Sequence, residues 1–102
     1  MIGEAELNLL KTTAILLNLE RGGLADETAV INALKNGKLG GAGFDVLSVE
    51  PPKQGNPLLE PLPNLIVTPH MAWASDEATR NLVRILEGNI NQFVAGKPQN
   101  IV

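Results

Sequence analysis

Short, almost unbroken apolar runs recur at three places in this chain and predict its strands. They cover residues 14–19, 41–47 and 64–68. The first is continuously apolar over strand length, which is typical of a strand covered on both faces in a parallel sheet. Glycines at positions 40, 41 and 43 open the second run, and they indicate that its backbone packs closely against a neighbouring element.

Stretches with helical spacing lie before, between and after these runs. Residues 3–11 place two leucines on one face beside acidic residues and predict a short helix. Asp26 as an N-cap and Gly37 as a stop delimit a helix between the first two strands. The longest apolar stripe follows an N-cap at Ser75 and continues to Gly96, so the longest helix is expected there.

The order of these elements predicts an α/β fold. A strand, a helix and a strand within residues 14–47 form a βαβ unit, in which the crossover is right-handed and the strands are parallel. Residues 51–63 contain five prolines, which exclude a helix and predict a long ordered loop. The sequence therefore predicts a parallel sheet with flanking helices and a long C-terminal helix.

Composition narrows the function classes. The 102 residues form one domain, and the net charge is −3 with eight scattered basic residues, which argues against a nucleic-acid partner. The chain has no cysteine and a single histidine, so disulfides, thiolate catalysis and the common zinc sites are excluded and no metal is expected. The start of the chain is acidic, and no apolar run is long enough to cross a membrane, so we predict a cytoplasmic protein.

Four chemically reactive or charged side chains lie at or near the ends of the predicted strands: Arg21, Asp45, Glu50 and His70. In an open parallel sheet, ligands bind beyond the carboxyl ends of the strands. All but Asp45 fall at or past such an end, and Asp45 is expected inside its strand. An arginine can grip a carboxylate with two hydrogen bonds, and a histidine with an acid partner can move a proton near neutral pH.

Taken one at a time, the same residues also have ordinary structural explanations. Arg21 and Glu50 would then be surface charges, Asp45 would cap a turn, and His70 would be a packed loop residue. Each position alone leaves both interpretations open, so only the combination favours a site.

That combination resembles the family of D-isomer-specific 2-hydroxyacid dehydrogenases along nearly the whole chain. The matching motifs are Asn-Leu-Glu-Arg-Gly at 18–22, Asp-Val at 45–46, Glu-Pro at 50–51 and Thr-Pro-His-Met-Ala-Trp at 68–73. The residues after His70 look most like members that act on glycerate and hydroxypyruvate. The resemblance implies a small 2-hydroxy or 2-keto acid as substrate and NAD or NADP as cofactor.

The resemblance also implies a role for each motif residue. Arg21 would bind the substrate, and together with Asn18 and Asp45 it would lie at the cofactor. Glu50 would pair with His70 and stabilise the imidazolium. His70 would be the general acid in reduction and the general base in oxidation.

Only the latter half of a Rossmann-like sheet is implied. The Gly-x-Gly-x-x-Gly fingerprint does not occur in these residues. We therefore expect residues 1–102 to be the C-terminal part of an NAD-binding and catalytic domain that alone binds NAD(H) weakly and turns over little. Its helix and tail, at about 75–102, would pack back on a substrate domain.

Two alternatives stay open at this point. Family members usually carry a small residue directly before the arginine, whereas Glu20 stands here and would compete with the substrate carboxylate if it points into the site. The second alternative concerns the whole chain. In it, the chain is a non-enzymatic folded remnant, or an interaction module that forms a dimer or other homo-oligomer through an uncovered sheet edge.

Overall fold

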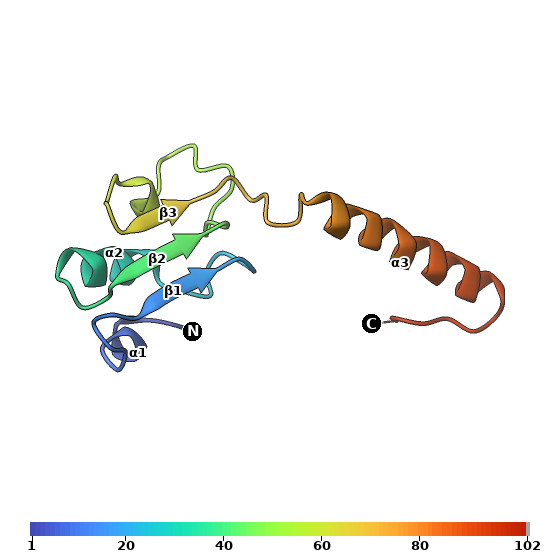
Figure 1. The fold of residues 1–102 in the computed structure, drawn as a ribbon, viewed down its shortest axis with the longest axis horizontal. Coiled ribbons are helices and arrows are strands. Elements are labelled where there is room, and N and C mark those ends of the chain that lie inside the picture. Colours follow the sequence, from blue (N-terminus) through green and yellow to red (C-terminus); the bar gives the residue numbers. More distant parts are fainter. Residues whose placement is uncertain (102) are drawn as a thin grey trace. The chain divides into compact units, whose positions relative to one another are not determined.

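The computed structural model describes residues 1–101 and divides them into two compact units, residues 1–71 and the residues from Ala72 onward (Figure 1). Val102, the last residue of the predicted tail, lies outside the described part. The elements, in chain order, are α1 (Glu4–Leu7), β1 (Ile15–Asn18), α2 (Glu27–Lys35), β2 (Gly41–Phe44), the 3-10 turn η1 (Pro57–Leu59), β3 (Leu65–Val67) and α3 (Asp76–Val94).

The three strands form one parallel sheet in the order β1-β2-β3. In its register Ile15 lies opposite Gly41, and Ala42 lies opposite Leu65. The helix α2 connects β1 to β2, so the predicted βαβ unit is confirmed. All three strands end at the same edge of the sheet (Figure 1), and this edge receives the loops that carry the candidate residues.

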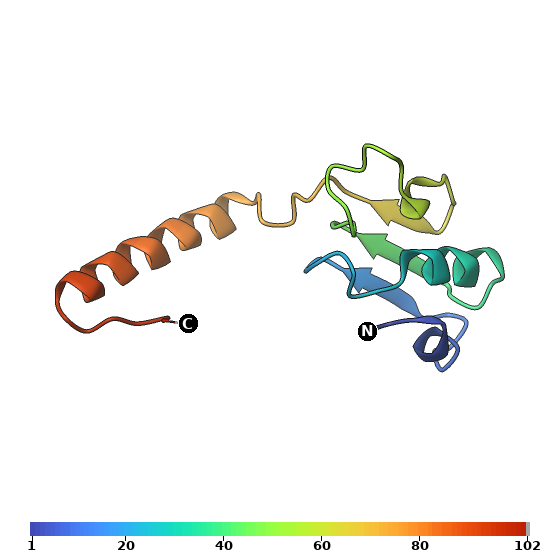
Figure 2. The ribbon, with the colours of Figure 1, turned by 180° about the vertical axis from the view of Figure 1, so that it is seen from behind.

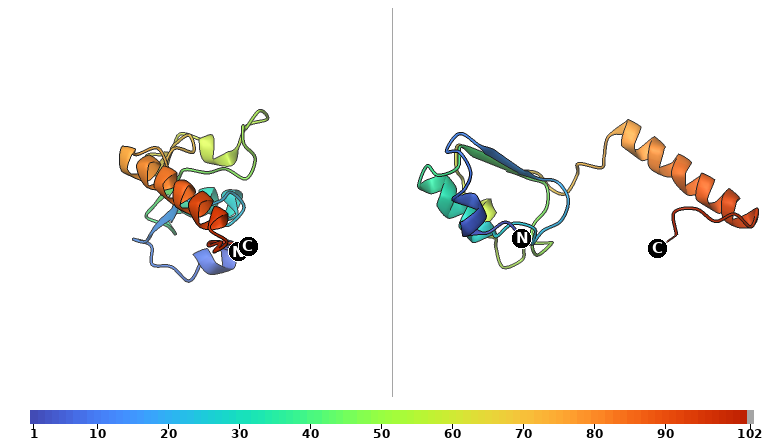
Figure 3. Two further views of the ribbon diagram at one scale, coloured as in Figure 1. Left: turned by 90° about the vertical axis from the view of Figure 1, so that its right-hand side faces the viewer. Right: turned by 90° about the horizontal axis from the view of Figure 1, so that it is seen from below.

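One face of the sheet carries the core of the first unit. The Asp26 side chain accepts a hydrogen bond from the Ala29 N–H at 2.9 Å and begins α2 where the sequence predicts. Figure 2 shows α2 lying across this face. In Figure 3 α1 and α2 lie on the same side of the sheet. The buried apolar core comprises Leu7, Ala25, Val30, Ile31, Ala33, Leu34, Leu39, Ala42, Phe44 and Leu58.

The other face of the sheet is uncovered, which contradicts the prediction that the first strand is buried on both sides. Ile15, Leu17 and Ile66 point to this face and are 71%, 65% and 70% exposed. No helix of the first unit crosses it in the described residues (Figure 3). The strand has the composition of a doubly covered strand, but residues 1–71 supply only one covering layer.

Two local predictions need correction. The first helix covers only Glu4–Leu7, because after Leu7 the backbone continues in short turns, with the Leu10 N–H bonded to the Leu7 carbonyl. The proline-rich segment does contain one helical turn, η1. It forms because the Asn56 side chain accepts from the Leu58 N–H at 2.8 Å and because proline suits the first position of a helix.

The second unit consists of α3 and the segments that flank it. The Ser75 hydroxyl accepts a hydrogen bond from the Ala78 N–H at 3.1 Å, which confirms the predicted N-cap. After Gly96 the tail returns to the helix, where Gln99 and Asn100 both donate to Asn89 Oδ1. No residue of α3 is buried. No described helix has the length and apolar character that a membrane span requires.

Glycines permit close contacts between backbones in the first unit, as predicted for the second strand. A Cβ on Gly40, just before β2, would lie 3.0 Å from the backbone carbonyl carbon of Thr13. The tightest approach is at Gly22, where a Cβ would lie 1.9 Å from the Leu47 carbonyl oxygen and 2.6 Å from the Ser48 nitrogen. The loop after β1 therefore rests directly on the peptide that follows β2.

This contact predicts that Gly22→Ala destabilises the first unit. The methyl group would collide with backbone that cannot move aside as a side chain can, so we expect a loss near the upper end for overpacked sites, about 3 kcal/mol. Urea unfolding followed by circular dichroism measures the change.

A matched control is Gly88→Ala in α3, where a Cβ would make only an ordinary contact of 3.6 Å with Gln99. There alanine should stabilise the helix by about 1 kcal/mol. Equal unfolding midpoints for Gly22→Ala and the wild type would contradict the close approach.

Candidate functional site

A cavity of about 530 Å³ opens at the carboxyl edge of the sheet, beyond β2 and β3. Predicted site residues contribute its polar groups, namely Asp45, Glu50 and His70. Its apolar wall comes mainly from the loop after β2 and the end of β3. The remaining lining residues are Leu47, Pro51, Pro52, Leu59, Val67, Thr68 and Pro69.

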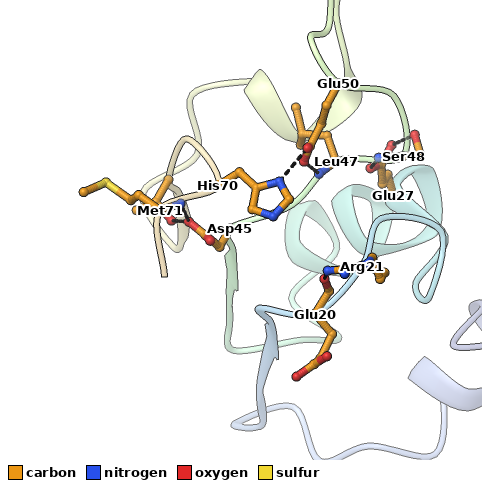
Figure 4. Close-up of polar contacts among 10 residues, drawn as sticks. Glu20, Arg21, Glu27, Asp45, Leu47, Ser48, Glu50, His70 and Met71 are labelled. Atoms are coloured by element: carbon orange, nitrogen blue, oxygen red, sulfur yellow. Dashed lines mark hydrogen bonds and ion pairs between the residues drawn. The ribbon is translucent and has the colours of Figure 1, made fainter. Parts of the chain in front are cut away.

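Glu50 and His70 form a hydrogen-bonded acid–histidine pair in this cavity, as Figure 4 shows. Nδ1 of His70 lies 2.6 Å from Oε2 of Glu50. The other carboxylate oxygen, Oε1, accepts a hydrogen bond from the Leu47 N–H at 2.7 Å. Because an ionised carboxylate only accepts hydrogen bonds, the proton between the pair resides on Nδ1. The second ring nitrogen, Nε2, therefore points away from Glu50.

The same contacts hold Glu50 in its charged form. The hydrogen bond from the Leu47 backbone is the largest cause that lowers the pKa of Glu50, and the hydrogen bond with His70 is the second. A carboxylate bonded in this way prefers to stay ionised. Glu50 is thus available as a negative partner for the imidazole throughout the neutral range.

Asp45 lies just beyond the end of β2, whereas the prediction placed it inside the strand. The ladder ends at Phe44, whose carbonyl accepts from the Thr68 N–H. Asp45 is buried, and its Oδ1 accepts from the Thr68 hydroxyl at 2.5 Å and from the Met71 N–H at 2.9 Å. These partners flank His70, whose φ of 53° lies in the left-handed region. Asp45 therefore fixes the backbone that carries the histidine.

Asn18 and Arg21 belong to the loop after β1. The buried Asn18 amide donates to the Arg21 carbonyl at 3.0 Å and accepts from the Glu20 N–H at 3.2 Å, so it shapes the loop. The Arg21 side chain is exposed, and its Nη1 donates to the Glu20 carbonyl at 2.7 Å. Neither residue lines the cavity at His70. Their contacts with substrate or cofactor remain predictions.

The orientation of Glu20 answers the question that its position raised. In Figure 4 its carboxylate points away from Arg21. No ion pair joins Glu20 to Arg21 within residues 1–101, so Glu20 does not neutralise the arginine. Glu20 lies in the bend that follows β1, and its side chain is exposed.

The sequence did not reveal the contacts of Glu27, which was expected only as an acid in the first turn of α2. Its Oε1 accepts from the Ser48 N–H at 2.6 Å, and its Oε2 accepts from the Ser48 hydroxyl and Asn56 Nδ2, both at 2.7 Å. No periodicity or motif signals contacts between residues more than twenty positions apart.

The fold and the cavity together define a class of protein. It is an α/β domain with a parallel sheet and an acid–histidine pair in the crevice beyond the strand ends, a place where such folds bind ligands. The chain belongs to a family described as "D-isomer specific 2-hydroxyacid dehydrogenase, NAD binding domain", whose model matches residues 1–72. The family resemblance of the motifs is thereby confirmed.

Relatives in sequence cover the whole chain. A glycerate dehydrogenase of Methylorubrum extorquens is 59% identical over 100% of this chain, and a hydroxypyruvate reductase of Blautia hydrogenotrophica is 39% identical over 100% of it. The chain corresponds to 33% and 31% of these relatives, so it spans about a third of their length.

Solved structures confirm the predicted Rossmann-like fold. A glyoxylate reductase from Paecilomyes thermophila has a TM-score of 0.82 and 31% identity, covering 97% of this chain and 30% of its own. A D-isomer specific 2-hydroxyacid dehydrogenase from Lactobacillus delbrueckii ssp. bulgaricus, in its NAD-complexed form, has a TM-score of 0.81 and 33% identity, covering 98% and 34%.

The bonds of Glu50 predict a pH-dependent stability. Because its pKa is lower in the folded chain than the ordinary value of 4.5, Glu50 contributes stability that is fully present above about pH 4.5 and is lost as pH falls through the lower, folded value. Denaturant unfolding of the wild type and Glu50→Gln, compared from pH 7 down to pH 3, measures this contribution.

The difference between the two proteins should shrink as the pH falls below about 4.5. His70→Asn is the control, since it keeps the Leu47 hydrogen bond and should retain part of the effect. A difference that grows as the pH falls from about 4.5 to 3 would show that the sign is wrong.

Proposed function

We propose that this chain supplies the acid–base pair of an NAD(P)-dependent dehydrogenase that interconverts D-2-hydroxy acids and 2-keto acids of the glycerate and hydroxypyruvate type. The observation that carries the proposal is the 2.6 Å contact between His70 and Glu50 in the cavity beyond the sheet. The relatives named for glycerate and hydroxypyruvate support this choice of substrate.

The pair is suited to proton transfer at the carbonyl oxygen of the substrate. With Nδ1 committed to Glu50, Nε2 is the nitrogen that faces a ligand, and in reduction it would donate a proton to the forming alkoxide. The Glu50 carboxylate stabilises the imidazolium before transfer. In oxidation the neutral imidazole would take the hydroxyl proton back.

The neighbouring residues would bind and orient. Arg21 retains further guanidinium N–H groups beside the one bonded to Glu20, and these would hold the carboxylate of the acid. Asn18 shapes the loop that presents Arg21. Asp45 would touch the nicotinamide side of the cofactor and would keep its hydrogen bonds with Thr68 and Met71.

The described residues fit the reacting end of a dinucleotide but not its phosphates. The cavity at His70 has apolar walls, including Leu47 and Val67, that suit a flat ring. When bound there, the reduced nicotinamide would supply the hydride. The start of α2, in contrast, carries the Asp26 cap and Glu27, and these acids would repel a pyrophosphate at the helix N-terminus.

We therefore expect a chimera to separate the two parts of the function. In the chimera, this chain replaces the matching third of the Methylorubrum extorquens glycerate dehydrogenase. It should bind NADH and reduce hydroxypyruvate, whereas the chain alone should show no micromolar NADH binding in calorimetry. NADH oxidation followed by absorbance measures turnover.

In the same chimera His70→Gln should lower kcat by at least about 100-fold, the smaller end for a lost general acid, with NADH binding retained. Glu20→Ser is the matched control in the neighbouring loop and should leave KM for hydroxypyruvate unchanged. An active His70→Gln chimera would refute the assignment. Micromolar NADH binding with turnover by the chain alone would refute the expectation that the chain needs the rest of the dehydrogenase to bind its cofactor.

A second role, self-association, is favoured by the uncovered sheet face. Ile15, Leu17 and Ile66 form an apolar patch on it, and patches of this kind mark interaction sites. We propose that two copies of the chain associate through this face or the adjoining strand edge. The apolar stripe of α3, which includes Leu82 and Ile85, would instead pack on a substrate domain. The cytoplasmic location also remains a prediction.

Self-association predicts a sedimentation coefficient that rises with protein concentration. Leu17→Lys should abolish the rise, because a charge placed in an apolar contact costs several kcal/mol. Lys53→Glu, on the exposed loop after β2, serves as the control for an altered surface charge. A concentration-independent monomer would refute this second role.

A further inference from the structure

Glu27 stands out because its carboxylate accepts three hydrogen bonds from a loop that is far from it in sequence. Three donors meet its two oxygens at 2.6–2.7 Å: the Ser48 N–H, the Ser48 hydroxyl and the Asn56 side-chain amide. Glu27 is half-buried. Hydrogen bonds to a charged acceptor are roughly twice as strong as neutral ones, so this is an anchored contact.

The anchored loop is the turn that carries Glu50. Ser48 lies between Leu47, whose N–H binds Glu50 Oε1, and Glu50 itself. A turn of four residues has few ways to move one member without moving the next. Fixing the Ser48 N–H and hydroxyl therefore fixes the direction in which the Glu50 carboxylate leaves the backbone.

The anchor itself stands on a rigid element. Glu27 is the first residue of α2, directly after the Asp26 cap, and the next turn of the helix places Val30 and Ile31 in the core. Asn56, its third partner, also begins η1 through its bond to the Leu58 N–H. Glu27 thus joins the core helix to both ends of the loop that lies between Ser48 and Asn56.

We propose that Glu27 is a positioning residue that holds the turn at residues 47–50 so that Glu50 meets Nδ1 of His70. Its importance for catalysis rests on the function proposed above, but its effect on the pair does not. Glu27 is not among the residues that line the cavity, so we expect it to act through Glu50.

The single histidine of the chain makes the proposal measurable without substrate or cofactor. Long-range ¹H–¹⁵N spectra at mildly alkaline pH report which ring nitrogen of His70 carries the proton. In the wild type the bond to Glu50 should favour the Nδ1–H tautomer. In Glu27→Gln an amide NH₂ group, which is itself a donor, replaces one of the two oxygens that accept from the three donors. The tautomer ratio of His70 should then shift toward Nε2–H by about tenfold, the size of one hydrogen bond to a charged group.

Two further variants bracket this result. Glu50→Gln should shift the ratio in the same direction and further. Glu77→Gln removes an acid from the first turn of α3 instead of α2, and it should leave the ratio unchanged, so it controls for the loss of charge at a helix start. A Glu27→Gln ratio equal to that of the wild type would overturn the proposal.

If Glu27→Gln fails to fold, Ser48→Ala decides the matter, because it removes the hydroxyl contact and keeps the backbone N–H bond. A smaller shift in the same direction supports the proposal, and an unchanged ratio overturns it. In the chimera, Glu27→Gln should lower kcat about tenfold with NADH binding unchanged. A chimera without any turnover would refute the proposed function, while the tautomer ratio would still decide the role of Glu27.

Discussion

The site depends on one carboxylate that is divided between two donors. Glu50 gives one oxygen to the backbone of its own turn and the other to the imidazole of a different loop. The first contact makes the second effective, because a carboxylate tethered at 2.7 Å loses little further freedom when it meets the histidine. Without this tether, the contact between Glu50 and His70 would contribute little stabilisation, because the pair is exposed.

The surrounding loops converge through contacts between backbones and polar side chains. The loop after β1 rests on the peptide after β2 at Gly22, and buried Asp45 ties the end of β2 to the segment after β3. Apolar packing forms the core on one face of the sheet, but polar contacts set the geometry at its edge. Apolar packing therefore dominates in the core and polar contacts dominate at the site, while Gly22 and Glu50 contribute to both.

Much of this architecture could be predicted from sequence because it follows from local rules. Apolar runs gave the parallel strands, and the Asp26 and Ser75 caps gave the starts of α2 and α3 within one residue. The pairing of Glu50 with His70 came from the family resemblance. Two features that could not be predicted depend on distant parts of the chain: the anchoring by Glu27 and the uncovered sheet face. The turn η1 depends on a local bond of Asn56, but the prolines around it favoured a loop. An apolar run does not show whether the chain supplies a second covering layer.

The backbone of His70 has a consequence for how such a chain can change over generations. Its φ of 53° is a conformation in which asparagine, aspartate and histidine are several-fold enriched and which β-branched residues rarely adopt. A change to asparagine would keep the loop and remove the acid–base chemistry. Descendants that lose the reaction but keep the fold are therefore expected to carry asparagine or glycine at this position, so the identity of one residue records whether selection still acts on proton transfer.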